Sequence, residues 1–237
     1  MNDKAYESVR NREDRGCIIM KDVVKSFQSG TGTIEILKNI TINIEKGEFV
    51  GVFGKSGSGK STMLNMLTGI DKPTRGEVWI KTSPIHKYSE SEMALLRGES
   101  IGIVFQFFQL LPMLTVLENV LLPMDFCKKI KKSERRERAM LLLRKLGIEE
   151  QAHKYPTAIS GGQQQRAAIA RALANDPDII IADEPTGNLD SVTSREIFDI
   201  FRKLAATGKT IVIVTHDNSI RDEFSRVIQI SDGKIVS

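Results

Sequence analysis

The sequence lacks the features that mark secreted, metal-binding or membrane-spanning proteins. Its two cysteines, Cys17 and Cys127, are too far apart for a zinc-binding pair or a disulfide framework, which favours a reducing compartment. The longest apolar-leaning stretch, residues 101–126, contains two prolines and several polar side chains, unlike a membrane-spanning helix. Residues 1–16 are polar and charged and lack the apolar core of a secretory signal. We therefore expect a soluble protein with a disordered tail over residues 1–16.

A strong excess of charge of one sign is also missing. The net charge of +4 is small for 237 residues, so composition does not indicate nucleic-acid binding. The most densely charged segment, residues 128–138, mixes both signs, and Glu134 and Arg138 have helical i,i+4 spacing. This favours a solvated helix face, with a nucleic-acid patch as the alternative. No internal repeat is visible, and residues 17–237 have a length that suits one α/β domain.

The main positive signal is a glycine-rich loop between an apolar run, residues 48–53, and a helical pattern, residues 62–67. The loop and the first residue of the helix are Gly54, Lys55, Ser56, Gly57, Ser58, Gly59, Lys60, Ser61 and Thr62. Glycines let the backbone turn its N–H groups inward, and a helix N-terminus favours anions, so the loop suits a triphosphate. In the pattern G-x-x-x-x-G-K-S, Lys60 reaches the β- and γ-phosphates and Ser61 ligates Mg²⁺. The flanking strand and helix disfavour a flexible linker.

Two adjacent acids, Asp183 and Glu184, follow the apolar run of residues 179–182. Such a run is typical of a central parallel strand, and open α/β sheets bind ligands at the carboxyl ends of their strands. We expect Asp183 to hold Mg²⁺ through water and Glu184 to orient or deprotonate the attacking water. Their position downstream of the glycine-rich loop disfavours a pair of ordinary loop acids.

Gln106 and His216 also stand at the ends of predicted strands, residues 101–105 and 210–215. Taken alone, a glutamine or a histidine in such a place is more often structural. Because both strands could end at the phosphate site, we keep Gln106 as a candidate and predict that His216 contacts the γ-phosphate.

A second potential phosphate site opens the alanine-rich helix after residue 160. Ser160, Gly161, Gly162 and Gln163 form a capped helix start, which exposes further backbone N–H groups. One nucleotide rarely needs two such sites in one chain, which points to a composite site between two molecules. An ordinary capped helix is the alternative.

The N-terminal third predicts two half-buried antiparallel strands, residues 17–24 and 32–44. Phe27 is expected between them, either as an ordinary aromatic or as a platform for an adenine ring, and the sequence leaves these alternatives open. Helical patterns cover residues 89–98 and, with breaks, residues 115–147; a β-hairpin closes the chain over residues 226–236.

In this order and spacing, the motifs resemble the nucleotide-binding subunits of ABC transporters. The matching segments are the Walker A loop at residues 54–61, the Q-loop at Gln106, the LSGGQ signature at residues 159–163, Walker B at residues 179–183 with its catalytic Glu184, the D-loop at Asn188, Leu189 and Asp190, the H-switch at His216, and the A-loop at Phe27. Three positions depart from the usual family residue: Ile159 replaces leucine, Phe27 replaces the commoner tyrosine, and Lys55 stands where a small or neutral residue is frequent. Residues 104–112, 117–120 and 183–190 resemble the MacB/LolD/FtsE-like branch in particular.

The resemblance implies a P-loop NTPase fold with a RecA-like α/β core, an antiparallel β subdomain and an α-helical subdomain over about residues 88–165. It implies that two copies sandwich two ATP molecules, each between one chain's loop and the other chain's Ser160–Gln163, with Asp190 nearby. It assigns ATP-binding residues in the loop, Mg²⁺ contacts to Ser61, Gln106 and Asp183, and catalysis to Lys60, Gln106, Glu184 and His216.

The resemblance also implies a separate transmembrane permease subunit, a peripheral location on the cytoplasmic side of the membrane, and no nucleic-acid partner. Export or extraction of a peptide, lipoprotein or antibiotic-like cargo would follow. The alternatives are the ATPase of a membrane signalling or cell-wall-regulating complex, or a soluble ABC ATPase acting on nucleic acid or ribosomes. The single cassette and the absence of a long coiled coil between Lys60 and Ser160 fit the soluble class poorly.

Overall fold

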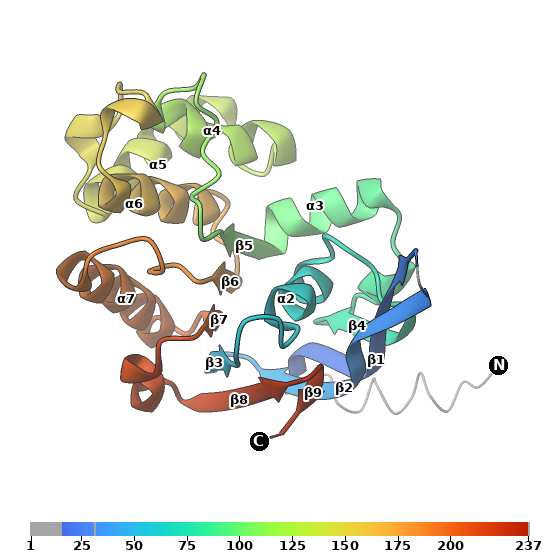
Figure 1. Ribbon diagram of the computed structural model, residues 1–237. Coiled ribbons are helices and arrows are strands. Elements are labelled where there is room, and N and C mark those ends of the chain that lie inside the picture. Colours follow the sequence, from blue (N-terminus) through green and yellow to red (C-terminus); the bar gives the residue numbers. More distant parts are fainter. Residues whose placement is uncertain (1–15, 31, 237) are drawn as a thin grey trace.

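The computed structural model describes residues 16–30 and 32–236, which form two β-sheets and a group of helices (Figure 1). The larger sheet has the strand order β5-β6-β7-β3-β8-β9, in which all neighbouring pairs are parallel except β8 and β9. Its strands are β3 (Phe49–Phe53), β5 (Ile101–Val104), β6 (Ile179–Asp183), β7 (Thr210–Thr215), β8 (Arg226–Ser231) and β9 (Lys234–Ile235). The smaller, antiparallel sheet has the order β2-β1-β4, built from β1 (Gly16–Ser29), β2 (Gly32–Glu45) and β4 (Arg75–Ile80).

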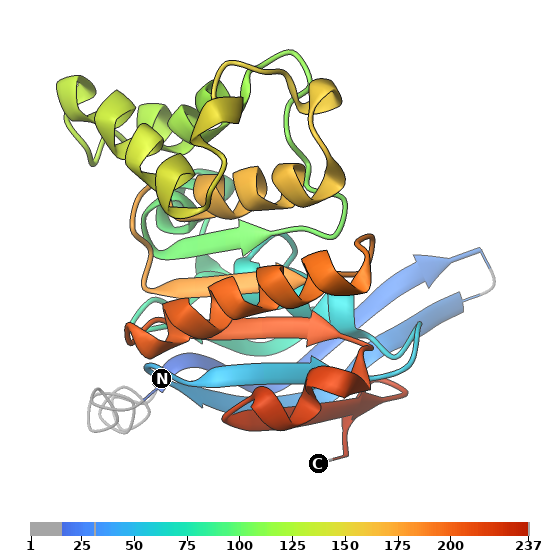
Figure 2. The same cartoon turned by 90° about the vertical axis from the view of Figure 1, so that its left-hand side faces the viewer.

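The central parallel strands, β6, β7 and β3, are buried on both faces. In β3, Phe49 and Phe53 join one apolar cluster, whereas Val50 and Val52 join the other. The first cluster includes α7 (Ser191–Ala206), which lies in front of the sheet in Figure 2, and the second includes α2 (Lys60–Thr68) and the antiparallel sheet. This double burial explains why these strands occur in the sequence as continuous apolar runs.

The remaining helices gather at one end of the large sheet, beyond β5 (Figure 1). They are α3 (Glu90–Ser100), α4 (Val116–Cys127), α5 (Lys132–Lys145) and α6 (Gly161–Ala172). Two short 3₁₀ helices, Glu149–Gln151 and Pro156–Ala158, lie between α5 and α6, whereas Ile85–Lys87 follows β4 and Asn218–Glu223 connects β7 to β8. Reciprocal capping boxes start α3, α4 and α6 at Ser89, Thr115 and Ser160. The predicted break within residues 115–147 lies at Lys128, which has a left-handed backbone. Helix α6 extends beyond residue 165, the predicted end of the helical subdomain.

The N-terminal sheet differs from its prediction in two places. Strand β1 begins at Gly16, within the predicted tail, whose other residues lie outside the described part of the chain. The strand also continues to Ser29, so Phe27 pairs with Ile34 inside a hairpin rather than lying between two strands. Residues 27–29 are exposed on this hairpin, and this part of the strand therefore lacks the alternating apolar pattern that identifies a half-buried strand.

Within residues 16–30 and 32–236, no helix is both long and apolar enough to cross a membrane.

Candidate functional site

The glycine-rich loop connects β3 to α2, as its flanking patterns predict. A Cβ atom on Gly54 would lie 2.5 Å from both the Ile230 carbonyl oxygen and the Ser58 Oγ, so only glycine fits at the start of the loop. Gly59 has a φ of 104° and serves as the N-cap of α2. The left-handed backbone at this position is readily accessible to glycine, which allows the loop to turn directly into the helix.

Lys60 is the first residue of α2 and is only 9% exposed. Its Nζ donates to the carbonyl oxygens of Gly54 at 2.8 Å and of Lys55 at 3.1 Å, so the ammonium group is held by the loop's own backbone. Ser58 is also buried, and its Oγ has no hydrogen-bond partner among the described residues. A cation and an unpaired hydroxyl inside a backbone loop at a helix N-terminus suit an anionic ligand.

Asp183 ends β6 with one carboxylate oxygen, Oδ1, buried and without a partner in the described part of the chain. Burial raises the pKa of Asp183, which the Ser61 hydroxyl opposes by hydrogen bonding and the nearby Glu184 carboxylate reinforces. A buried unpaired oxygen is unusual and needs an explanation. Hard divalent cations are bound by carboxylate and hydroxyl oxygens, so Asp183 and Ser61 fit a Mg²⁺ site.

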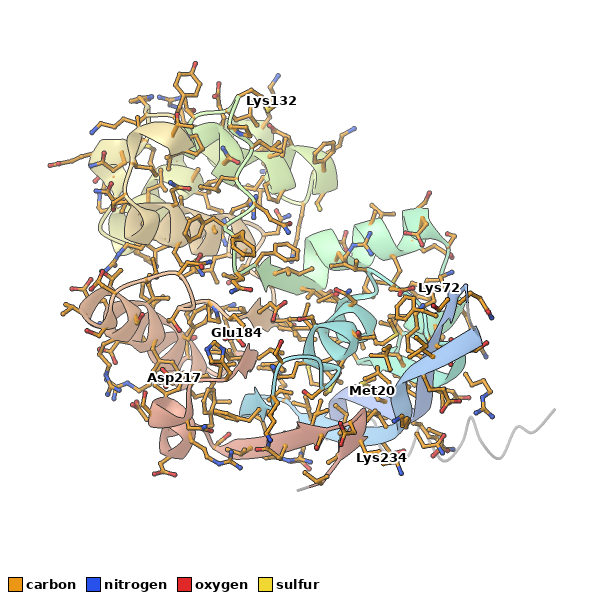
Figure 3. All side chains as sticks on the ribbon, viewed as in Figure 1. Met20, Lys72, Lys132, Glu184, Asp217 and Lys234 are labelled. Atoms are coloured by element: carbon orange, nitrogen blue, oxygen red, sulfur yellow. The ribbon has the colours of Figure 1, made fainter. Side chains whose placement is uncertain are left out.

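Glu184 and His216 form a pair at the ends of β6 and β7. The Nδ1 of His216 lies 2.8 Å from both carboxylate oxygens of Glu184, and the Glu184 backbone N–H donates to the Val214 carbonyl at 2.8 Å. The Glu184 side chain is 13% exposed and that of His216 67% exposed. Figure 3 shows Glu184 near the middle of the view, beside the ends of the parallel strands and far from Lys132. The predicted contact of His216 with a γ-phosphate stays a prediction; its observed partner is Glu184.

Gln106 follows β5 and lies beside the turn after Glu184. Its carbonyl oxygen accepts from Asn188 Nδ2 at 3.0 Å, and a Cβ atom on Gly187 would lie 3.3 Å from its Nε2. Four strands therefore supply site residues at one edge of the sheet. Gln106 comes after β5, the glycine-rich loop after β3, the acidic pair at the end of β6, and His216 after β7. These four strands are consecutive in the sheet and run parallel, so their carboxyl ends meet there.

The second predicted phosphate site lies elsewhere in the chain. Ser160 caps α6 by accepting from the Gln163 N–H at 3.3 Å, while Gln163 Oε1 accepts from the Ser160 N–H at 3.0 Å. A Cβ atom on Gly161 would lie 3.5 Å from Leu189, and one on Gly162 would lie 2.6 Å from Thr193. Thus the start of α6 packs against the beginning of α7 and the turn before it. The contacts described for it do not include the glycine-rich loop.

The contacts described for Asp190 and Phe27 do not include the residues at the sheet edge. Asp190 caps α7, accepting from the N–H groups of Val192 and Thr193 and from the Thr193 hydroxyl. Phe27 is 46% exposed on the β1–β2 hairpin, with Lys25 Nζ 4.9 Å from the centre of its ring. Its exposed ring is compatible with base stacking, which stays a prediction.

The sequence reading gave no site role to Gly233 or Arg171, which support the site, and named Asn188 only as part of the D-loop. Gly233, read only as part of a hairpin turn, donates its N–H to the Ser58 carbonyl at 3.1 Å and so braces the glycine-rich loop. The Asn188 amide holds Gln106, and Arg171 donates to the carbonyls of Phe108 and Gln109. Only the Asp-Gly pair at residues 232–233 gave a local signal; the other contacts join segments far apart in the sequence.

Comparison with known proteins gives a consistent result. Residues 37–187 match the family model described as ABC transporter. The chain is 48% identical to the lipoprotein-releasing system ATP-binding protein LolD of Aquifex aeolicus, covering 85% of this chain and 90% of LolD. It is 44% identical to a macrolide export ATP-binding/permease protein MacB of Hyphomonas neptunium, covering 93% of this chain and 34% of that longer protein.

A solved structure agrees with these relatives. The dimeric ATP-binding cassette MJ0796 of Methanocaldococcus jannaschii, bound to ADP and Pi in a post-hydrolysis state, superposes with a TM-score of 0.87 at 46% identity, covering 93% of this chain and 97% of the cassette.

Proposed function

Because the chain belongs to the ABC transporter family and is an ATP-binding, ATP-hydrolysing cassette, we propose that it powers a separate membrane subunit in a MacB- or LolD-like complex. The observation that carries this proposal is a segment with exposed apolar side chains that follows Gln106. Phe107 is 71% exposed and Met113 70% exposed, in the segment between β5 and α4. Exposed apolar side chains are typical of interaction sites when a partner covers them, and this segment begins at Gln106, beside the turn after Glu184.

At the catalytic edge, the loop of residues 54–61 binds the phosphates of ATP. The Lys60 ammonium exchanges its bonds to the Gly54 and Lys55 carbonyls for phosphate oxygens. Ser61, Asp183 and Gln106 would hold Mg²⁺, which would supply positive charge to neutralise the phosphates when bound. The orphaned Asp183 oxygen supports this role.

Glu184 accepts a proton from the attacking water, and His216 keeps the Glu184 carboxylate in position. An ionised carboxylate only accepts hydrogen bonds, so the 2.8 Å contacts support a His216 ring that carries its proton on Nδ1. We infer that His216 orients the base, in addition to any contact with phosphate through its exposed ring.

We further propose that two chains form a head-to-tail dimer with two ATP molecules. Each ATP lies between the loop of one chain and Ser160, Gly161 and Gly162 of the other. The separation of these two elements within one chain supports a composite site, as does the dimeric state of the MJ0796 cassette. ATP makes contacts with both halves only in the closed dimer, so binding shifts the equilibrium towards closure and hydrolysis reverses the shift.

The membrane subunit is expected to bind at Phe107 and Met113 on the cytoplasmic side of the membrane, with no nucleic-acid partner. The proposed cargo class is a peptide, lipoprotein or antibiotic-like molecule. A membrane complex for signalling or cell-wall regulation is the second candidate, because the same surface would serve a partner that transports nothing.

The test is a tagged pull-down from detergent-solubilised host membranes in the presence of MgATP. We expect a stoichiometric polytopic membrane protein, its loss with Phe107→Ser, and its retention with Phe126→Ser, a control at the end of α4 with a similar exposure of 74%. Extracytoplasmic domains of the recovered protein would separate transport from signalling. Recovery of ribosomes or DNA without a membrane protein would move the assignment to the soluble ATPase class.

A further inference from the structure

Arg171, near the end of α6, makes two contacts with the segment that follows Gln106. Its Nη1 donates to the Gln109 carbonyl at 2.5 Å, and its Nη2 donates to the Phe108 carbonyl at 2.9 Å. The planar guanidinium thus bridges two consecutive backbone carbonyls in a forked geometry that a lysine cannot reproduce. This contact joins the helix that begins at Ser160 to the turn that begins at Gln106.

The turn that Arg171 holds has an unusual backbone. Phe108 and Gln109 both have positive φ angles, 58° and 48°, although neither is a glycine. Two consecutive left-handed residues with side chains are unfavourable and persist only where the surroundings impose them. Locally, the Phe108 N–H donates to the Phe105 carbonyl at 3.2 Å and the Gln109 N–H to the Phe107 carbonyl at 2.5 Å. The external support for the carbonyls of these two residues comes from Arg171.

The other end of the same segment is also fixed. The Gln106 carbonyl accepts from Asn188, and the ring of Phe108 lies 3.7 Å from the place a Cβ would take on Gly161. Residues 106–109 are therefore held between the turn after Glu184 and both ends of α6. Burial lowers the pKa of Arg171 because it removes water from the charged guanidinium. Loss of its hydrogen bonds to the two carbonyls would therefore leave a desolvated charge without partners, which is costly.

We infer that Arg171 is a positioning residue that makes α6 and the turn after Gln106 move as one body. This inference rests on the proposed composite site. In that site the start of α6 contacts the partner's nucleotide, whereas Gln106 contacts the chain's own. Arg171 then links the two ATP sites, because a shift of α6 caused by one nucleotide moves Gln106 at the other. Its loss uncouples the sites without removing any group that touches ATP.

The test compares Arg171→Met with a matched control, Arg138→Met. Arg138, on α5, also donates to two consecutive carbonyls, those of Leu173 at 3.4 Å and Ala174 at 2.6 Å just after α6, and its described hydrogen bonds do not include the Gln106 turn. Three measurements are made on each purified chain: amide hydrogen exchange of residues 107–111, nucleotide binding by the monomer, and ATP hydrolysis as a function of MgATP concentration.

We expect Arg171→Met to accelerate exchange at residues 107–111, lower kcat about 10- to 100-fold as expected for a misplaced active-site group, and bring the Hill coefficient towards 1. Nucleotide affinity of the monomer should stay within about twofold, since binding energy is not removed. Arg171→Lys should recover only part of kcat, because one ammonium cannot satisfy both carbonyls in the same geometry. Arg138→Met should keep kcat and the Hill coefficient.

Equal effects of Arg171→Met and Arg138→Met on kinetics, or faster exchange at residues 107–111 with unchanged kinetics, would overturn the inference. Failure of the proposed function has a different signature. If the unmodified chain hydrolyses ATP without cooperativity and without dimerising, the composite site is wrong, and the link between two nucleotides falls with it. In that case the exchange data still report whether Arg171 holds the turn.

Discussion

Among individual residues, Glu184 has the environment of a base that is held in place. His216 fixes its carboxylate, and the backbone N–H of Glu184 is anchored to β7. We predict that Glu184→Gln keeps MgATP binding but lowers turnover at least about 100-fold, the typical contribution of a general base. The protein should then accumulate as an ATP-bound dimer, which phosphate release and size-exclusion chromatography with MgATP would measure. Turnover at the unmodified rate would remove Glu184 from this role.

Asp183 gives a pH-dependent prediction at the same scale. Its pKa is raised in the folded state above the ordinary 3.8, so the unfolded chain ionises first as pH rises and the folded state loses relative stability. The loss starts above that value and is complete once pH exceeds the folded pKa. At pH 7, Asp183→Asn should therefore raise the unfolding temperature of the nucleotide-free protein, by roughly 2–4 °C for each 1 kcal/mol recovered.

The gain from Asp183→Asn should vanish when thermal unfolding is measured near pH 3, where the carboxyl is protonated in both states. The variant should also lose most of the additional thermal stabilisation that Mg²⁺ gives in the presence of ATP, because that effect depends on ion binding to the folded state. A pH-independent gain, or Mg²⁺ stabilisation equal to that of the unmodified protein, would contradict the assignment.

Among the elements, the packing of α6 on α7 depends on the second of two adjacent glycines. A Cβ on Gly162 would lie 2.6 Å from the Thr193 methyl, and the Thr193 hydroxyl is already bound to Asp190, so the side chain cannot easily turn away. Gly161 has room, with its nearest neighbour at 3.5 Å. Alanine has a higher helix propensity than glycine at both positions, so the difference in stability between the two variants measures the clash alone. In urea unfolding, Gly162→Ala should be about 1–3 kcal/mol less stable than Gly161→Ala. Equal midpoints would contradict this packing.

An element could be predicted from the sequence where local patterns determine it, and could not where contacts between distant segments determine it. Continuous apolar runs in the sequence predicted the parallel strands. Because such strands bind ligands at their carboxyl ends, the sequence also predicted that Lys60, Asp183, Glu184 and His216 lie at one edge of the sheet. The outer part of β1 carried no such pattern, since its hairpin is exposed. The Arg171 contact joins residues 62 positions apart, and Gly233 reaches back from the last hairpin to Ser58. Such pairings depend on how whole elements pack and leave no local pattern.

For the whole molecule, the composite site predicts complementation between two inactive chains. Lys60→Ala should lose ATP affinity, because it removes the loop's ammonium group. Ser160→Arg should keep the nucleotide affinity of the monomer, since the start of α6 packs on α7, but it should block closure of the dimer. In a mixed dimer, the intact loop of the Ser160→Arg chain would face the intact Ser160 of the Lys60→Ala chain. Mixing the two should therefore restore part of the ATP hydrolysis that neither shows alone.

The control for complementation is Thr115→Arg, which removes an equivalent capping box at the start of α4. Loss of either cap should cost about 1 kcal/mol of stability, so a purely structural effect would be common to both variants. We expect Thr115→Arg to hydrolyse ATP by itself and Ser160→Arg to require the second chain. If the mixture hydrolyses no more ATP than its two components measured separately, the two phosphate-binding helix starts do not meet across a dimer, and each would have to act within its own chain.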